Sequence, residues 1–385
     1  MSPPVPSMNE PAMPAADYLN RCHFGDARGV LRQMIVASVR VNTIVTSPPY
    51  WGLRSYLPDG HPDKMLEIGH EPTIGKFIAT LVEVFDLCRR VLRDDGTLFV
   101  NMGDSYAANR GYQVASTLMG GDATNQAQRA DGRGMKAASQ GLKPKDLVGQ
   151  PWRLAFALQR AGWWLRQDII WHKPNPMPES VRDRCTKAHE YIFLLSKSER
   201  YHFDQESILE PVSPNTHARL SQDVQNQIGS ARANGGAKTN GNMKAVGRIP
   251  GNVNPPKGQA AYEAGVEQHR TKAGLLAYAR KLADTASGAK SNVSFDEAMA
   301  IMPTRRNKRS VWTVASDPYR GAHFATFPCK LIEPCILAGC PIGGIVLDPF
   351  GGSGTTAQVA KALGRNWILI DLNRANAPLL AERLR

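Results

Sequence analysis

Short apolar runs along the chain alternate with longer segments in which apolar residues recur every three or four positions. The short runs predict strands at 18–22, 43–46, 97–101, 165–171, 191–195, 345–347 and 367–370. The longer segments, 74–92, 146–161 and 357–363, predict helices, the first ended by Asp94-Asp-Gly96. This alternation predicts a mostly parallel α/β sheet of about seven strands, with helices on both faces. No helical pattern separates 165–171 from 191–195, so these two strands are expected to form an antiparallel hairpin at one edge of the sheet.

The strand at 43–46 runs directly into Ser47-Pro-Pro-Tyr-Trp-Gly52. Neither proline can donate a backbone N–H, so both helix and further sheet are excluded here. The chain is expected to stay extended past the strand end and to present Ser47, the Pro48 carbonyl and the two aromatic rings. A fixed acceptor beside a stacking ring suits a flat, amino-bearing ligand such as a nucleobase. The alternative is a proline-rich turn with a packed tyrosine.

A glycine-rich turn follows the strand predicted at 345–347. It reads Asp348-Pro-Phe-Gly-Gly-Ser-Gly-Thr-Thr356, and the next strand ends in Asp371. Glycines permit a tight turn close to a ligand, and an acidic residue after the second strand is placed to bind a ribose. The glycine-rich turn and Asp371 together therefore indicate a nucleoside-containing cofactor. The turn lacks the Gly-Lys-Ser/Thr of a Walker loop and the G-x-G-x-x-G typical of NAD sites.

The amino-acid composition indicates the class of binding partner and the cellular compartment of the protein. The formal net charge of +13 indicates a polyanionic partner such as nucleic acid. The six cysteines form no Cys-x-x-Cys, so we expect no metal site and interpret them as reduced thiols in a cytosol. No apolar stretch is long enough to predict a membrane span. Residues 1–17 are proline-rich and are expected to form a disordered tail.

Ser47-Pro-Pro-Tyr50 and Phe350-x-Gly352-x-Gly354 together resemble the two signature motifs of the S-adenosylmethionine-dependent DNA amino-methyltransferases. The catalytic motif comes first and the cofactor motif last, which resembles the permuted β group of that family. Three further stretches are similar to family motifs: Gly25-Asp-Ala27, Trp171-His-Lys-Pro-Asn-Pro176 through His189-Glu-Tyr191, and His323-Phe-Ala-Thr-Phe-Pro328. The resemblance implies a Rossmann-like methyltransferase sheet, circularly permuted, in which 345–347 supplies the central strand.

The resemblance also implies S-adenosylmethionine as cofactor, double-stranded DNA as substrate, and a target base flipped out of the duplex. Ser47, Pro48, Pro49 and Tyr50 would be the catalytic residues. The cofactor would be bound by Asp26, Phe324, Phe327, Asp348, Phe350, Gly352, Gly354, Thr355 and Asp371. The target base or DNA would be contacted by Trp51, Trp171, Lys173, Asn175, Arg305, Arg306, Lys308 and Arg309.

Two segments without strand or helix patterning complete the domain prediction. Residues 107–140 are rich in Gly, Ala and Gln and are expected to form a mobile loop within a catalytic half, 18–200. Residues 201–310 are basic and are assigned to target recognition by elimination, although a solvated insertion would have the same composition. Residues 311–385 are then the cofactor-binding half of the same domain.

Several alternatives stay open at this point. The target is adenine N6 or cytosine N4, since serine at the first catalytic position occurs in both subfamilies. An RNA methyltransferase and a DNA-binding relative without catalysis are the rival functions. Cytosine-C5 methylation is disfavoured because no Pro-Cys-Gln supplies a nucleophile. Many β-group enzymes pair, so the resemblance includes a homodimer among the expected states.

Overall fold

A computed structural model describes residues 13–52, 55–107, 141–143, 145–212, 305–316 and 327–385. The chain divides into two compact units, one of residues 1–208 with 309–385 and the other of 209–308. In the second unit the described residues include a two-stranded antiparallel pair, β6 (Glu210–Pro211) with β7 (Arg305–Arg306). The predicted tail up to residue 12, the loop 108–140, most of the target-recognition region and Phe324 lie outside the described residues.

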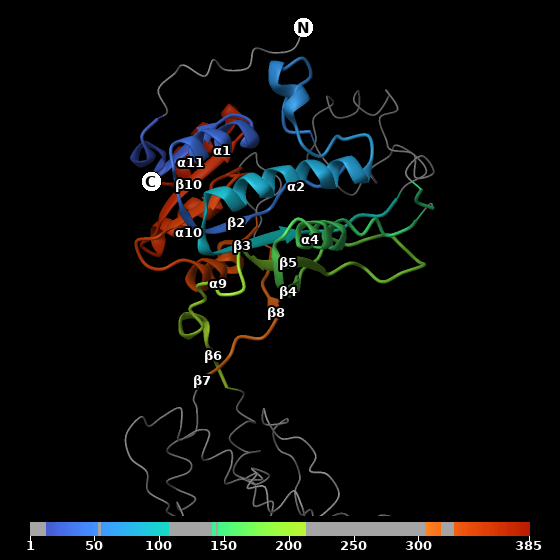
Figure 1. Cartoon of the computed structure of the whole chain (residues 1–385). Helices are drawn as coiled ribbons and strands as arrows, with labels where there is room; N and C mark the ends of the chain where they lie inside the picture. The colour runs from blue at the N-terminus through green and yellow to red at the C-terminus, as the bar shows by residue number, and fades with distance from the viewer. Residues whose placement is uncertain (1–12, 53–54, 108–140, 144, 213–304, 317–326) are drawn as a thin grey trace, which may run out of the picture. The chain divides into compact units, whose positions relative to one another are not determined.

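The first unit is built on an eight-stranded sheet (Figure 1). In spatial order its strands are β1 (Arg21–Phe24), β10 (Asn366–Asp371), β9 (Ile345–Asp348), β2 (Val41–Thr46), β3 (Leu92–Met102), β5 (His189–Ser196), β4 (Trp164–His172) and β8 (Val311–Thr313). Neighbouring strands are parallel except at β5, which is antiparallel to both β3 and β4. Strands from the two ends of the chain thus pair in the middle, where β9 lies between β10 and β2.

Helices cover both faces of this sheet. One face packs against α1 (Ala27–Val36), α2 (Ile74–Val91) and α4 (Gln150–Arg160). The opposite face packs against α9 (Cys329–Gly339), α10 (Thr355–Ala362) and α11 (Ala377–Arg383). Short 3₁₀ helices occur at η1 (Ala15–Tyr18), η2 (Pro62–Leu66), η5 (Glu206–Ile208) and η6 (Arg374–Asn376). No helix in the described part of the chain is long and apolar enough to cross a membrane.

The continuous apolar runs of the central strands follow from this double coverage, because successive side chains point to opposite faces. In β9, Leu347 packs with α1 and α2, whereas its neighbour Val346 packs with α9 and α10. In β10, Ile368 and Ile370 alternate with Leu369 in the same way.

The predicted fold class is confirmed, and each of the seven predicted strands has a counterpart in the sheet. The antiparallel pair 165–171 and 191–195 is present as β4 and β5, and β9 is an interior strand. The eighth strand, β8, lies outside β4 and makes the edge. It was not predicted because three residues, of which only Trp312 is buried, carry too little pattern.

Three predicted boundaries were wrong. Residues 18–22 do not form one strand: Asn20 adopts a left-handed conformation, φ 56°, so a 3₁₀ turn precedes β1. Asp94-Asp-Gly96 lies within the irregular start of β3, after α2 has already ended at Val91. The helix predicted at 146–161 begins only at Gln150, after Gly149 in a left-handed conformation and with Pro151 in its first turn.

Candidate active site

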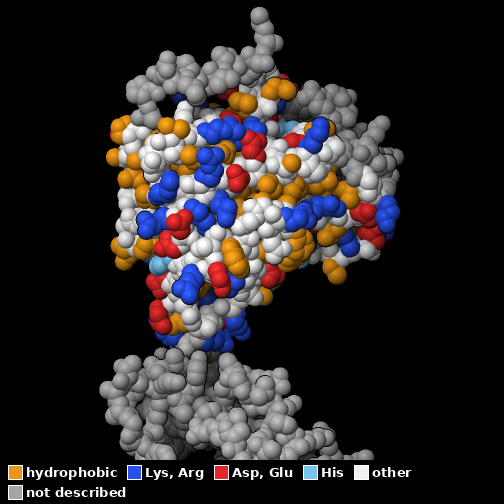
Figure 2. All heavy atoms as spheres, viewed as in Figure 1, with side chains coloured by type: hydrophobic (Ala, Val, Ile, Leu, Met, Phe, Trp, Pro, Cys, Tyr) orange, Lys and Arg blue, Asp and Glu red, His pale blue; other side chains and the backbone are white. Residues whose placement is uncertain are grey.

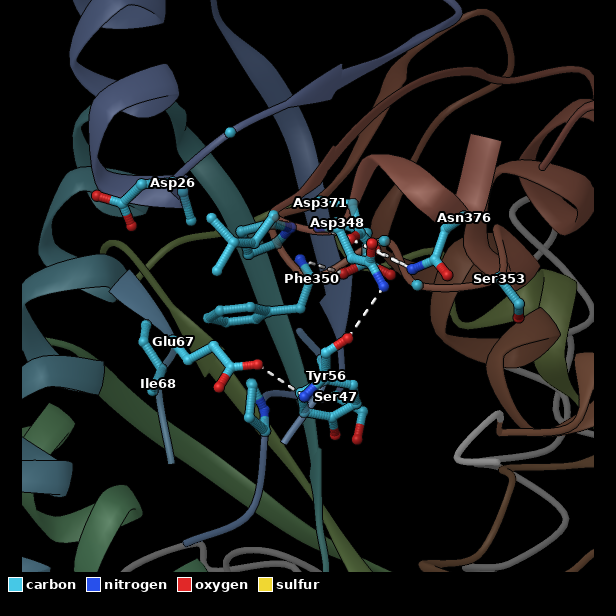
Figure 3. Close-up of a pocket in the computed structure, with 18 of the residues that line it drawn as sticks. Asp26, Ser47, Tyr56, Glu67, Ile68, Asp348, Phe350, Ser353, Asp371 and Asn376 are labelled. Atoms are coloured by element: carbon cyan, nitrogen blue, oxygen red, sulfur yellow. Dashed lines mark hydrogen bonds between the residues drawn. The ribbon is translucent and has the colours of Figure 1, made fainter. Parts of the chain in front are cut away.

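A cavity opens at the carboxyl ends of four adjacent parallel strands, β1, β10, β9 and β2 (Figure 3). Ligands of open α/β sheets bind at this edge, where the chain leaves the strands. Most of the lining residues come from the four strand ends and from the loop that follows the Ser-Pro-Pro-Tyr stretch, and Phe327 comes from the segment before α9. They include Asp26, Ser47, Pro49, Tyr56, Glu67, Phe327, Asp348, Phe350, Gly352, Ser353, Thr355, Asp371 and Asn376. The Ser-Pro-Pro-Tyr stretch and the glycine-rich turn, far apart in sequence, therefore meet in one cavity.

Asp348 ends β9 and is only 2% exposed. Its carboxylate accepts hydrogen bonds from the Thr46 hydroxyl at 2.6 Å, the Thr356 hydroxyl at 2.7 Å and the Phe350 N–H at 3.0 Å. Burial raises the pKa of Asp348 to about 6, and the three donors act against that rise. The carboxylate thereby ties β9 to β2 and to the first turn of α10, and so fixes the floor of the cavity.

The glycine turn brings the backbone close to this cavity. Gly352 and Gly354 have φ values of 49° and 84°, which glycine adopts without strain. A Cβ on Gly351 would lie 2.9 Å from the Cβ of Leu369, so a side chain there would push the turn away from β10. Phe350 extends from this turn toward Glu67 and Ile68, as Figure 3 shows.

Asp371 ends β10 and is 9% exposed. Its carboxylate accepts the Asn373 N–H at 2.7 Å and the Asn376 amide at 3.3 Å, and its carbonyl accepts the Gly25 N–H at 2.9 Å. Burial raises the pKa of Asp371 to about 6. On the β1 side of the cavity, Asp26 is held by Arg28 at 3.0 Å.

Ser47 and Tyr50 follow β2 in an extended segment without helix or strand, as the two prolines predicted. Ser47 lines the cavity, and the Tyr50 hydroxyl donates to the Glu190 carboxylate at 2.9 Å. Burial, and then the charge of Glu190, raise the pKa of Tyr50 well above its ordinary value. Tyr50 therefore stays protonated, as a phenol rather than a phenolate.

This geometry agrees with the comparison to known protein families, in which the profile described as DNA methylase (N6_N4_Mtase) matches residues 41–382. The chain belongs to this DNA methylase family. The predicted family, an S-adenosylmethionine-dependent DNA amino-methyltransferase, is thereby confirmed; the comparison does not divide adenine-N6 from cytosine-N4 enzymes.

Two curated relatives match this DNA methylase over most of both chains. The type II methyltransferase M.Cfr9I of Citrobacter freundii is 38% identical over 94% of this chain and 86% of its own length. The type II methyltransferase M.SmaI of Serratia marcescens is 38% identical over 94% and 89%. Among solved structures, the PvuII DNA methyltransferase (cytosine-N4-specific) aligns with a TM-score of 0.49 at 15% identity, covering 94% of this chain and 86% of that one.

The tryptophans predicted to border the base pocket of the methylase are buried in the core instead of lining the cavity. Trp51 is 6% exposed and its indole N–H donates to the Glu71 carbonyl at 2.8 Å. Trp171 is 4% exposed and donates to the Val314 carbonyl at 2.8 Å. An indole has one N–H, and in each of these residues a backbone carbonyl accepts it.

Lys173 and Asn175, also predicted to touch DNA, are engaged within the protein. Lys173 pairs with Glu190 and lies 4.2 Å from the centre of the Trp171 ring. The Asn175 side chain holds the segment after β8 through the backbone of Ser316.

The basic run before β8 is partly engaged as well. Arg306 pairs with Glu210 at 3.0 Å across β6 and β7, and the exposed Arg305 donates to the Leu209 carbonyl. Lys308 is half-buried and Arg309 is exposed. On the face drawn in Figure 2, basic side chains are interspersed with acidic ones.

Sequence reasoning missed the loop that closes one side of the cavity. The Glu67 side chain, 2% exposed, accepts the N–H groups of Tyr56 and Leu57 at 2.7 and 2.5 Å. The Tyr56 carbonyl in turn accepts from the Asn373 amide at 3.1 Å (Figure 3). The loop after the catalytic stretch is thus joined, through Asn373, to the Asp371 carboxylate. No family motif and no periodicity marked these residues.

The pKa of Asp371 predicts how ligand binding varies with pH. An ionised carboxylate offers more acceptor positions to ribose hydroxyls than a protonated one. Because this pKa is about 6, we expect the affinity for S-adenosylhomocysteine to fall about tenfold between pH 7.5 and pH 5, by calorimetry. Asp371→Asn should bind more weakly at pH 7.5 and lose most of this pH dependence. A wild-type affinity that is constant over this range would contradict the assignment.

Proposed function

We propose that this DNA methylase moves the methyl group of S-adenosylmethionine to the exocyclic amino nitrogen of adenine or cytosine in double-stranded DNA. The observation that supports it is the shared cavity, in which Ser47 and Pro49 of the catalytic stretch face Asp348, Phe350 and Asp371 of the cofactor half.

The cavity residues suit this cofactor in chemistry as well as position. Asp371 is buried at a strand end. Its carboxylate would bind the ribose by accepting hydrogen bonds from the ribose hydroxyls. Asp26 would accept from the adenine amino group, and Phe350 and Phe327 would pack against the apolar parts. Gly352, Gly354 and Thr355, at the start of α10, would face the polar methionine end. When bound, the cofactor supplies an electrophilic methyl group on its sulfonium.

The chain's own contribution is to position the amino group and to polarise it. The lone pair of this nitrogen is delocalised into the base, which makes it a poor nucleophile. The Ser47 hydroxyl and the Pro48 carbonyl would accept its two N–H groups and favour positive charge on the nitrogen as it attacks, and the methylated nitrogen would then release one proton to solvent. The amino group is out of reach within a duplex, so the base must be flipped, and Tyr50 would stack on it.

Contacts to the rest of the duplex are assigned to the basic residues before β8 and to residues 201–310. Arg305, Arg306, Lys308 and Arg309 would contact phosphates, with affinity that falls as salt is raised. Lys173 and Asn175 would act at the base pocket through the elements that they hold. The homodimer and the cytosolic location stay predictions.

Mass spectrometry of nucleosides tests the function directly. DNA that lacks methylated amino bases would be incubated with the protein and S-adenosylmethionine, then digested to nucleosides. We expect N6-methyladenine or N4-methylcytosine, formed only when the cofactor is present, and the product names the target base. Absence of both, with an active control methylase in parallel, would contradict the proposal, as would 5-methylcytosine.

A further inference from the structure

The loop after the Ser-Pro-Pro-Tyr stretch forms one wall of the cavity. Its two ends meet where the Gly52 N–H donates to the Gly69 carbonyl at 2.8 Å. The loop residues that line the cavity are Tyr56, Leu66, Glu67 and Ile68. Three of these four side chains are apolar or aromatic, which suits a flat, weakly polar part of a ligand better than a charged part.

Both backbone polar groups of Tyr56 are bound by side chains. Its N–H donates to the Glu67 carboxylate at 2.7 Å, and its carbonyl accepts from the Asn373 amide at 3.1 Å (Figure 3). The orientation of this amide is set from its other side, because its oxygen accepts the Ala375 N–H at 3.0 Å. With N–H and carbonyl both held, the direction in which the Cα–Cβ bond of Tyr56 points is fixed as well.

The Tyr56 side chain stays outside the core although its backbone is fixed. Tyr56 is 36% exposed, whereas the next residue, Leu57, is 3% exposed. A tyrosine ring has a flat apolar face, which is the kind of surface on which a purine packs. Tyr56 therefore brings an aromatic surface that the core does not use to a cavity that it lines.

Glu67 holds the loop through both oxygens of its carboxylate. Its side chain is 2% exposed; one oxygen accepts the N–H groups of Tyr56 and Leu57, and the other accepts the Ser55 hydroxyl at 3.1 Å. The Lys64 ammonium lies 3.3 Å from this second oxygen. Because donors of its own loop surround the carboxylate, Glu67 acts by shaping the loop rather than by offering an oxygen to a ligand.

The hydrogen bonds of Asn373 indicate which part of the cofactor this wall meets. While its amide holds the Tyr56 carbonyl, its backbone N–H donates to the Asp371 carboxylate at 2.7 Å. One residue thus joins Tyr56 to the carboxylate that is assigned to the ribose. The nucleoside end of the cofactor is the part that lies near both.

We propose that Tyr56 is a cofactor-contacting residue that packs against the nucleoside end of S-adenosylmethionine, and that Glu67 is the positioning residue that holds it there. The inference rests on the proposed function and deepens it, because it adds to the cofactor site a wall that comes from the catalytic half of the chain. A wall held in place before the ligand arrives need not be ordered on binding, which favours affinity.

Calorimetry with two ligands tests the contact: S-adenosylhomocysteine, and methylthioadenosine, which lacks the amino-acid part. Tyr56→Ala should raise the Kd of both by about tenfold, since both carry the nucleoside, whereas Tyr56→Phe keeps the ring and should stay within about twofold of wild type. Wild-type affinity in Tyr56→Ala would overturn the proposal. So would a loss confined to S-adenosylhomocysteine, which would put Tyr56 at the methionine end.

The role of Glu67 is tested by combining variants. Glu67→Ala should also raise the Kd of S-adenosylhomocysteine by about tenfold, but in the double variant with Tyr56→Ala the Kd should stay within about twofold of that of Tyr56→Ala alone. Losses that multiply would mean that Glu67 does not act through Tyr56, and would overturn its assignment. Asp63→Ala is the matched control: it removes the same charge from η2 of the same loop, at a side chain that is 49% exposed, and should bind as wild type.

Steady-state methyl transfer separates a contact from a loss of folded protein. In Tyr56→Ala the KM for S-adenosylmethionine should rise about as much as the Kd, with kcat within about threefold of wild type, because binding rather than the chemical step is weakened. A lower kcat with unchanged KM and earlier thermal unfolding would instead show a structural role and overturn the contact. If Glu67→Ala does not fold, Tyr56→Ala and Tyr56→Phe still decide, because they keep both backbone bonds of residue 56.

Failure of this inference differs from failure of the proposed function. Calorimetry needs no catalysis, so a wild-type protein that binds S-adenosylhomocysteine but transfers no methyl group to DNA would refute the function and leave the contact to be judged by the Tyr56 variants. A wild-type protein that transfers methyl groups, together with a Tyr56→Ala variant of unchanged Kd and KM, would refute the contact alone.

Discussion

Replacing Ser47 by alanine is expected to lower the rate of methyl transfer by about 100-fold or more, the effect of removing one fixed hydrogen-bonding group from a reacting centre. The hydroxyl lies at the end of β2, whose backbone is held by parallel pairing with β3 and β9. The substitution should therefore remove one acceptor without moving the cavity. Tyr50→Ala should slow transfer comparably through loss of stacking. Single-turnover incorporation of tritiated methyl groups measures both.

The Kd for S-adenosylhomocysteine separates this expectation from simple loss of the site. In Ser47→Ala this Kd should change by less than about twofold, because the hydroxyl is expected to bind the target amino group and not the cofactor. Ser198→Ala, on the turn after β5 where the hydroxyl donates to the Asp94 carbonyl at 2.7 Å, is a matched control that should transfer at the wild-type rate. Parallel loss of transfer and cofactor affinity would mean that the cofactor cavity has been assigned wrongly.

Replacing Asp348 by alanine is expected to lower the free energy of unfolding by about 3–5 kcal/mol. The carboxylate accepts from Thr46, Thr356 and the Phe350 N–H, all at a position that is 2% exposed. Alanine would leave these donors without an acceptor, at a cost of about 1–3 kcal/mol for each that finds no substitute. Urea denaturation at pH 7 measures the loss.

Asp348→Asn is the isosteric control and should stay within about 1 kcal/mol of wild type at pH 7, since its oxygen replaces one acceptor and the threonine hydroxyls can rotate. In the wild type, burial raises the pKa of Asp348 to about 6 from an ordinary 3.8. A raised carboxyl pKa favours folding fully below pH 4, and that contribution is lost as pH rises to 6. Because asparagine does not titrate, the free energy of unfolding of Asp348→Asn should not show this part of the decrease between pH 4 and pH 6. Equal stability of the alanine and asparagine variants would contradict the role of the hydrogen bonds.

Much of the fold was predictable because each central strand is buried on both faces. A run such as Val346-Leu-Asp348 is apolar on both sides and then ends in a polar residue, so the strand and its ligand-facing end are visible together. The same logic placed Asp371 and Ser47 on the cavity. The positions of these residues can be predicted from the neighbouring sequence alone, because they do not depend on a distant partner.

The positions that were missed depend on partners far away in the sequence. Trp51 follows the catalytic stretch but packs in the core, because the distant Gln150 and Glu71 supply acceptors for its two N–H groups. Glu190 received no role from its sequence, although Asn101 and Tyr50 meet it from other strand ends. The Glu67 side chain closes the cavity by accepting hydrogen bonds from backbone N–H groups. Such bonds leave no pattern in the sequence of side chains.

The pairing of β9 with β2 has a consequence for synthesis of the protein. Thr43 lies opposite Val346, so the middle of the sheet joins segments some three hundred residues apart. Closing so long a loop lowers the conformational entropy of the chain, and only the completed contacts offset this loss. Such long-range pairing therefore slows folding. While the ribosome is still making the first half, β2 has a bare edge where β9 belongs. The methylase can therefore acquire its cofactor cavity only after translation has passed β10, and the nascent chain until then exposes an unpaired strand of the kind that chaperones protect.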